Sequence, residues 1–321
     1  MGLTYDLRSD YLKEGYSLEE TAEFDRESTI EAIEQSLARL GHVPARIGHA
    51  RHLVCALARG ERWDIVFNIA EGLSGLAREA QVPAILDAYR IPYTFSDPFV
   101  LSVCLHKGVT KRIVREAGVP TPDFFVIEEK ADIDRVTLPF PVFANPVAEG
   151  TGKGISGASK ISDREKLASV CNALLGKYRQ PVLVECFLSG REFTVGIVGT
   201  GEKTSVIGTL EIILNAHAEA DAYSYVNKEE CENLVEYRLV DDKESKRAEE
   251  TALKAWKVLG CRDAGRVDLR SDEKRVPNFI EANPLAGLNP EHSDLPILCA
   301  KKGISYDKLI ELIMESALSR I

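Results

Sequence analysis

The chain has 321 residues with 40 basic and 50 acidic side chains, which give a formal net charge of −10. This length suits two or three domains, and the hydrophobic fraction of 45% is typical of a globular protein. The acidic balance disfavours non-specific binding to nucleic acid and to anionic membrane surfaces.

Targeting and membrane signals are also missing from the sequence. No apolar run reaches the roughly 18 residues that a membrane span needs, and the first residues do not resemble a signal peptide. The seven cysteines are scattered without a CxxC pair, which favours reduced thiols over disulfides or zinc. We therefore expect a cytoplasmic protein with no nucleic-acid partner and no membrane partner.

In chain order, residues 1–95 predict an open α/β domain. Apolar residues three to four positions apart predict a helix over 28–40, and a short apolar run predicts a buried strand over 63–68. A helix up to residue 89 and an extended segment over 91–94 follow. Such sheets bind ligands at the C-terminal ends of their strands, here residues 68–72, so Glu71 is a candidate substrate-binding residue.

Two further units follow, over residues 96–180 and 181–321. In the first we expect a basic helix over 106–117, strands over 124–127 and 142–144, a glycine-rich loop over 149–156, and a helix over 163–178. In the second we expect strands over 181–185, 192–198 and 205–213, a helix over 243–259, a strand pair, and a C-terminal helix. The fold class is therefore α/β or α+β.

The strand pair is the most informative feature. Arg266 and Asp268 share one face of the first strand, Glu281 and Asn283 share one face of the second, and residues 271–274 are typical of a hairpin connection. Two carboxylates and an amide oxygen on one sheet face suit Mg²⁺ bound together with phosphates. The alternative is a solvated sheet face with ion pairs.

Other motifs are less specific. The loop over 149–156, which contains Thr151 and Lys153, is either a phosphate cover or a plain turn, because it matches neither the P-loop nor the GxGxxG pattern. The strand end over 185–192 can offer groups to adenine and ribose, or form a surface turn. Lys107, on the basic helix, can reach a phosphate or face solvent.

A polar loop with few helix or strand signals contains Tyr223, Tyr225 and Lys228. It predicts either a mobile lid over the substrate or an exposed loop.

Together, and in this order, these motifs resemble the ATP-grasp ligases and, within them, the D-alanine–D-alanine ligase family. The resemblance is strongest over residues 67–72, 91–98, 118–122, 181–197 and 264–310. It implies an ATP-grasp fold of three domains with ATP between the central and C-terminal domains. It also implies that a substrate carboxylate attacks the γ-phosphate of ATP and that an amine then attacks the acyl phosphate, which forms a dipeptide.

The resemblance assigns expected roles to the strand pair and the segment after it. Asp268, Glu281 and Asn283 would hold Mg²⁺ or Mn²⁺. Arg266 and the backbone of Gly287 would stabilise the oxyanion.

The nucleotide residues follow from the same resemblance. Glu185 and the backbone of Cys186 and Leu188 would bind adenine, Glu192 the ribose, and Lys107 the phosphates.

For the amino-acid substrates, Ser293 and Lys228 would bind the carboxylate of the second one. Tyr223 and Tyr225 would lie in the lid, and Thr151 stands where the family usually has serine.

Two departures from the family pattern bear on function. Asn145 replaces the lysine that the family usually places against the ATP phosphates. If the missing charge removed about 3 kcal/mol of transition-state stabilisation, the reaction would be about a hundredfold slower. We expect Lys153 to substitute in part. The N-terminal loop that binds the ammonium of the first D-alanine is missing, and either Glu20 or Glu23 is a candidate replacement.

Three hypotheses follow from these residues. The first is an ATP-dependent D-alanine–D-alanine ligase of cell-wall (peptidoglycan) synthesis, acting on small amino acids as a possible homodimer. The second keeps this chemistry with other amino acids. The third is a nucleotide-binding protein that has lost catalysis, which Asn145 favours and the complete set of strand-pair residues disfavours.

Overall fold

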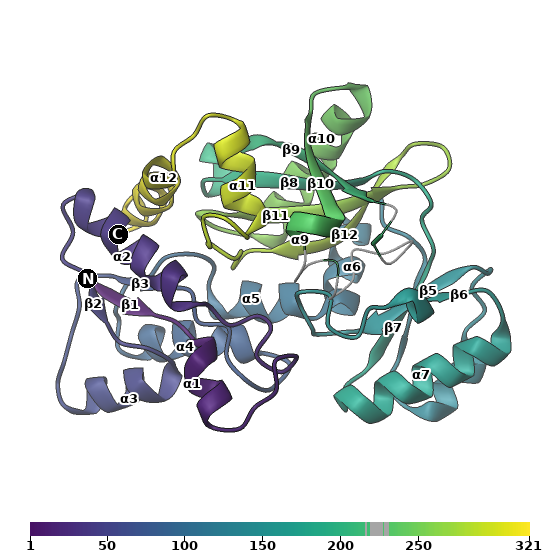
Figure 1. Ribbon diagram of the computed structural model, residues 1–321, viewed down its shortest axis with the longest axis horizontal. Coiled ribbons are helices and arrows are strands. Elements are labelled where there is room, and N and C mark those ends of the chain that lie inside the picture. The colour runs from purple at the N-terminus through teal and green to yellow at the C-terminus, as the bar shows by residue number, and fades with distance from the viewer. Residues whose placement is uncertain (216, 219–226, 228–230) are drawn as a thin grey trace.

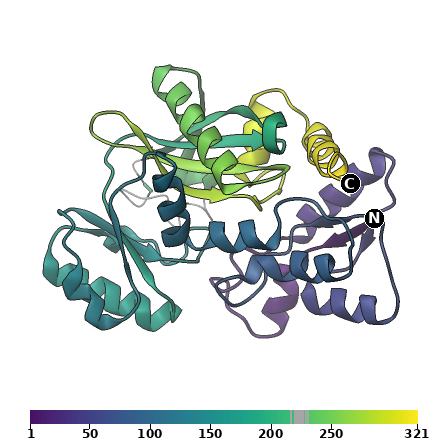
Figure 2. The same ribbon diagram turned by 180° about the vertical axis from the view of Figure 1, so that it is seen from behind.

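The computed structural model describes residues 1–215, 217, 218, 227 and 231–321, which form three β-sheets surrounded by helices (Figure 1). In both views the first and second sheets lie toward opposite ends of the long axis, and the third sheet lies above them (Figures 1 and 2). None of the helices described is long and apolar enough to span a membrane.

The first sheet is parallel and has the strand order β2-β1-β3. Helix α2 (Glu27–Arg39) buries Ile30, Ile33 and Leu37 completely against it, which confirms the helix predicted over 28–40. The elements of this unit are β1 (Gly2–Thr4), α1 (Arg8–Lys13), α2, β2 (Ala45–Arg46), α3 (Ala50–Ala58), β3 (Val66–Asn68), the 3-10 helix η1 (Arg78–Ala80) and α4 (Gln81–Ala88).

The second sheet is antiparallel and has the order β4-β7-β5-β6. Its elements are β4 (Phe124–Ile127), η2 (Lys130–Arg135), β5 (Val142–Pro146), η3 (Gly157–Ser159), β6 (Lys160–Ile161), α7 (Arg164–Tyr178) and β7 (Val182–Cys186). The predicted strands over 124–127 and 142–144 and the predicted helix over 163–178 are confirmed. Strand β7 pairs with β4 and β5, so we propose a domain boundary after Cys186 rather than at residue 180.

The third sheet is antiparallel and has the order β10-β9-β8-β11-β12. Its strands are β8 (Glu192–Val198), β9 (Ser205–Leu214), β10 (Val235–Val240), β11 (Ala264–Ser271) and β12 (Pro277–Asn283). Around it lie α5 (Pro98–Leu105), α6 (Lys107–Glu116), η4 (Gly201–Lys203), α9 (Cys231–Leu234), α10 (Lys243–Leu259), α11 (Asp294–Lys301) and α12 (Tyr306–Leu318). The predictions over 192–198, 205–213 and 243–259 are confirmed.

Helices α5 and α6 contribute to the hydrophobic core that lies against the third sheet. Val100 and Val114 are buried in the same cluster as Trp256 of α10 and Phe279 of β12. The predicted central unit of residues 96–180 is therefore divided between two cores.

A buried carboxylate joins the end of the chain to the first and third units. Asp263, just before β11, is fully buried and accepts hydrogen bonds from Phe95 N (2.6 Å), Arg320 Nη2 (2.7 Å) and Ser316 Oγ (2.8 Å). Its Oδ1 also accepts from Thr200 Oγ1 at 3.2 Å. One side chain thus joins its own segment to three others that are far apart in the sequence.

We predict that Asp263→Ala destabilises the protein by about 3 kcal/mol, because removing one partner of a buried ion pair leaves the other partner and the donors unsatisfied. Asp307→Ala is the control, because it removes an exposed ion pair with Arg39 (2.6 Å) and is expected to cost less than about 1 kcal/mol. Both are measured as free energies of unfolding in urea. Equal losses in the two variants would contradict the central position of Asp263.

Candidate active site

The register of β11 and β12 brings four polar side chains together. Arg266 lies opposite Asn283, and Asp268 lies opposite Glu281, so the juxtaposition predicted from strand alternation is confirmed. Asp268 pairs with Arg266 and accepts hydrogen bonds from Asn283 Nδ2 (3.3 Å) and from Thr194 Oγ1 (2.9 Å). The apolar neighbours Val267 and Ala282 point into the core on the opposite face.

These residues fit a hard divalent cation that also takes oxygens from a substrate. Asp268 and Glu281 supply carboxylates, and Asn283 has an amide oxygen. No group of three or more His, Cys, Asp or Glu residues placed to hold a metal occurs in the part of the chain that the structure describes. The donor set therefore suits Mg²⁺ shared with phosphate oxygens better than a cage made by the protein alone.

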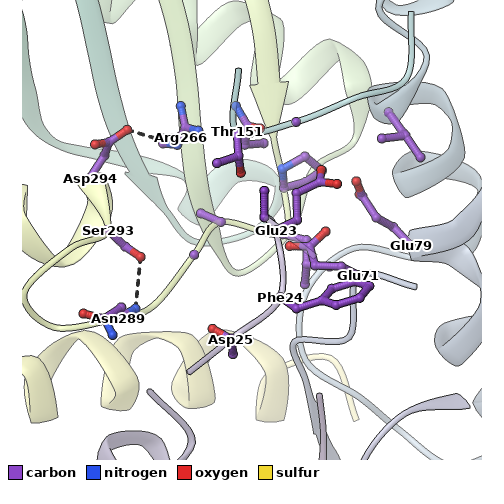
Figure 3. Close-up of a pocket in the computed structure, with 18 of the residues that line it drawn as sticks. Glu23, Phe24, Asp25, Glu71, Glu79, Thr151, Arg266, Asn289, Ser293 and Asp294 are labelled. Atoms are coloured by element: carbon purple, nitrogen blue, oxygen red, sulfur yellow. Dashed lines mark hydrogen bonds and ion pairs between the residues drawn. The ribbon is translucent and has the colours of Figure 1, made fainter. Parts of the chain in front are cut away.

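Arg266 is the cation at the centre of this face. Burial alone would lower the pKa of its guanidinium, but Asp268, Asp294 and Glu281 raise that pKa above its usual value. Its Nε lies 3.7 Å from Asp294 Oδ2 (Figure 3). The guanidinium therefore stays charged, as a group that stabilises a developing oxyanion must.

A first cavity lies against one part of this face, and we call it the nucleotide cavity because residues with a predicted nucleotide role line it. Residues of β5, β7, β8, β11 and β12 and of the loops beside them line it. They include the predicted nucleotide residues Asn145, Glu185, Cys186, Leu188 and Glu192. The predicted metal ligands Asp268 and Glu281 line it as well. The structure thus brings these residues together between the second and third sheets.

A buried lysine in this region is not signalled by the sequence. Lys111 of α6 is fully buried, and its Nζ lies 2.7 Å from Glu185 Oε1. Burial lowers the pKa of Lys111, although Glu185 opposes that shift. A lysine on a basic helix usually faces solvent, so nothing in the local pattern distinguishes Lys111 from its neighbours.

The two lysines that the sequence did predict as cations of the site, Lys107 and Lys153, lie elsewhere. Lys107 Nζ donates to the carbonyl of Glu149 and lies 3.3 Å from Glu281 Oε2, at the edge of the metal face. Lys153 Nζ pairs with Glu23 (2.6 Å) and with Glu149, and Lys153 does not line the nucleotide cavity. The expectation that Lys153 replaces the cation missing at Asn145 is therefore not supported, because its charge is already paired.

A second cavity, of about 180 Å³, opens at the part of this face that Arg266, Glu281 and Asn283 form. We call it the amino-acid cavity, because residues predicted to bind amino acids line it. Figure 3 shows Arg266 and Thr151 at its top, Asn289, Ser293 and Asp294 on one side, and Glu23, Glu71 and Glu79 on the other. Gly287 also lines this cavity, and a Cβ at that position would lie 2.8 Å from Ser293 Oγ. The predicted residues Arg266, Thr151, Gly287, Ser293 and Glu71 are thus brought together. Lys228, Tyr223 and Tyr225 lie outside the described residues.

The two candidates for the missing ammonium ligand differ in placement. Glu20 lies at the surface and accepts from Ser17 N at 2.9 Å. Glu23 lines the cavity, but Arg78 Nη2 reaches both of its oxygens (2.7 and 2.9 Å) and Lys153 pairs with it as well. Despite burial, Arg78 and Lys153 lower the pKa of Glu23 to about 2, so its negative charge is fully compensated.

A third carboxylate, Asp25, was not singled out from the sequence. Its backbone forms an isolated bridge with Leu7, two residues before α2 begins. Its side chain lines the cavity beside Thr29. Burial and the neighbouring Asp6 raise the pKa of Asp25 to about 8. The only sequence signal for Asp25 is that it is an acidic residue shortly before the helix predicted over 28–40.

The sequence of this chain is similar to those of known ligases. A family model described as D-ala D-ala ligase C-terminus matches residues 113–315. A D-alanine–D-alanine ligase from Aquifex aeolicus is 32% identical over 291 residues, which span 89% of this chain and 93% of the relative. The chain belongs to the D-alanine–D-alanine ligase family.

A second relative supports the family assignment, and two solved structures share the fold. The enzyme of that name from Thermotoga maritima is 31% identical over 89% of this chain and 90% of its own length. The solved structure of a D-alanine–D-alanine ligase from Bacillus anthracis covers 99% of this chain at a TM-score of 0.76, with 20% identity and 97% of that chain aligned. The VanG D-Ala:D-Ser ligase from Enterococcus faecalis covers 98% of each chain at 0.76 and 18% identity. The ATP-grasp fold expected from the sequence is confirmed.

We predict that Asp25→Asn stabilises the protein at pH 8 by roughly 1 to 3 kcal/mol, because a partly buried carboxylate without full compensation is removed. The raised pKa means that the folded state binds the Asp25 proton more tightly than the unfolded state does. The contribution of Asp25 to the free energy of unfolding is therefore fully present below pH 3.8, and it is lost as the pH rises toward about 8.

The difference in unfolding free energy between Asp25→Asn and the parent protein should accordingly be small at pH 4 and grow with pH. It is measured by urea unfolding across this range, and a constant difference would contradict the prediction. Asp64→Asn, at an exposed aspartate, serves as the control.

Proposed function

We propose that the protein is a Mg²⁺-dependent ligase that uses ATP to join two amino acids through an acyl phosphate. The observation that carries the proposal is the position of Glu281, which lines both the nucleotide cavity and the amino-acid cavity. A phosphoryl group leaving ATP and a carboxylate waiting in the second cavity would meet beside this residue. This juxtaposition is what phosphoryl transfer to a carboxylate requires.

In this proposal each residue of the face has one task. Asp268, Glu281 and Asn283 hold Mg²⁺, which neutralises phosphate charge when it is bound. Arg266 and the backbone N–H of Gly287 stabilise the oxyanion that forms when the amine attacks the acyl phosphate.

Residues around the face bind the substrates. Lys107 approaches the phosphates, Ser293 binds the carboxylate of the second amino acid, and Thr151 closes the glycine-rich loop over the site. Asp25 lines the same cavity as Glu23, and Glu23 is already paired with Arg78 and Lys153, so we assign the α-ammonium of the first amino acid to Asp25.

D-alanine is the first substrate to test, because the relatives that match most of the chain are named for it. Other amino acids are the alternative, because the N-terminal segment of this chain differs from the family pattern. Cytoplasmic cell-wall precursor synthesis and a homodimer through the N-terminal unit belong to the same proposal.

The test is phosphate release from Mg-ATP with D-alanine and then with a panel of other amino acids. We predict turnover that Asp268→Asn reduces at least about a hundredfold, because the loss of a metal ligand removes charge stabilisation worth about 3 kcal/mol at the transition state. Asp64→Asn should retain full activity. ATP binding without phosphate release for any amino acid would favour a non-catalytic nucleotide-binding protein.

A second prediction concerns the missing lysine. Asn145 is 5% exposed, lines the nucleotide cavity, and its Oδ1 has no hydrogen-bond partner among the described residues. We predict that Asn145→Lys lowers the KM for ATP about tenfold, because a cation would face the phosphates in a site of low dielectric constant. An unchanged KM would show that another cation already serves the nucleotide; Arg270, which lines the same cavity, would then be tested as Arg270→Met.

A further inference from the structure

The ammonium group of Lys111 is completely buried and is directed at three acceptors. Its Nζ lies 2.7 Å from Glu185 Oε1, 3.1 Å from the carbonyl oxygen of Phe279 and 3.3 Å from Thr121 Oγ1. Thr121 Oγ1 donates to the same carbonyl at 2.9 Å. An ammonium group has three N–H donors, so each donor has an acceptor here and the group is fixed in place.

The acceptors of Lys111 belong to both sides of the nucleotide cavity. Glu185 lies on β7 of the second sheet, and Phe279 lies on β12 of the third sheet. Glu185 lines the cavity between these sheets, whereas Lys111 lines neither this cavity nor the amino-acid cavity. Lys111 can therefore act on a bound nucleotide only through the groups that it holds.

The carboxylate of Glu185 depends on Lys111 for its position. Glu185 is 4% exposed, and among the residues that the structure describes no other hydrogen bond or ion pair holds its side chain. An ionised carboxylate only accepts hydrogen bonds, and its two oxygens can accept several. Part of this capacity remains for a ligand in the cavity, and the group that suits it is a hydrogen-bond donor.

Stability alone does not account for this buried pair. Taking two charges out of water is costly, and apolar residues of similar volume are often at least as stabilising as a buried ion pair. The apolar core of the third sheet lies close by, since Phe279 is one of its residues. A role of the carboxylate at the nucleotide cavity explains the pair better than its contribution to folding does.

We propose that Lys111 is a positioning residue, which holds the carboxylate of Glu185 where it accepts a hydrogen bond from the exocyclic amine of adenine. This inference rests on the proposed binding of ATP and adds to it a selection for the base. Glu185 touches the base, and Lys111 anchors Glu185 from outside the cavity. Without Lys111, the hydrogen bond to the amine would weaken, while contacts to the ribose and the phosphates would remain.

The test compares ATP with purine riboside triphosphate, which lacks only the 6-amino group. Dissociation constants of both nucleotides with Mg²⁺ are measured by calorimetry on the whole chain. ATP should bind at least about tenfold more tightly, because a hydrogen bond to an ionised group contributes on the order of ten- to a hundredfold. Lys111→Met should bring this ratio to within about threefold, mainly by weakening the binding of ATP. A merely structural role would weaken both nucleotides equally and leave the ratio intact.

Three further variants complete the design. Glu185→Gln should also reduce the ratio, and adding Lys111→Met to it should change the ratio by less than about twofold, because Lys111 acts through Glu185. Lys166→Met, which removes an exposed ion pair with Asp163 (3.6 Å), should leave the ratio unchanged. Lys111→Gln keeps a donor without the charge; it replaces Lys111→Met if that variant does not fold, and its ratio should fall at least about threefold.

Phosphate release tests the ligase proposal separately from this inference. If no amino acid supports turnover, the ligase proposal fails, but the two dissociation constants still test the role of Lys111. Equal affinities for ATP and the analogue in the parent protein would overturn the inference. A ratio that survives the substitution of Lys111, or the absence of ATP binding, would overturn it as well.

Discussion

The pairing of β11 with β12 is the constraint on which the rest of the site depends. It places Asp268 beside Glu281 and Arg266 beside Asn283, and it does so where the two cavities meet. A slip of one residue would turn these polar groups toward Trp256 and the core. Because β11 also pairs with β8 along its whole length, the register is fixed from both sides.

On the side of the cavity opposite this strand pair, ion pairs rather than a β-sheet hold the segments together. Glu23, from the segment before α2, joins Arg78 of η1 and Lys153 of the glycine-rich loop. A Cβ at Gly150 would approach Glu23 Oε1 to 2.3 Å, so any side chain at this position would displace the carboxylate from its present place beside the loop. The network joins two units and determines which carboxylates remain open to a ligand.

Much of the fold could be predicted from the sequence, because periodicity and length identify elements such as β4, β8 and α10. The metal face could also be predicted, since alternation within two adjacent strands is a local property. The sequence did not predict the burial of Lys111, Arg78 and Glu79, because the burial of a charged side chain depends on partners that are distant in the sequence. Arg78 and Glu23, for example, are 55 residues apart. Spacing alone could not separate Glu20 from Glu23 or reveal Asp25.

Helix α12 packs on α2, although the ribosome synthesises α12 long after α2. Arg39 and Asp307 meet across 268 residues, and Ile30, Leu309 and Ile313 share one core. At ribosomal rates this stretch takes on the order of ten to fifty seconds to synthesise. Throughout that time the nascent N-terminal sheet lacks its final apolar cover, so the growing chain is a natural client for chaperones that shield exposed hydrophobic surface.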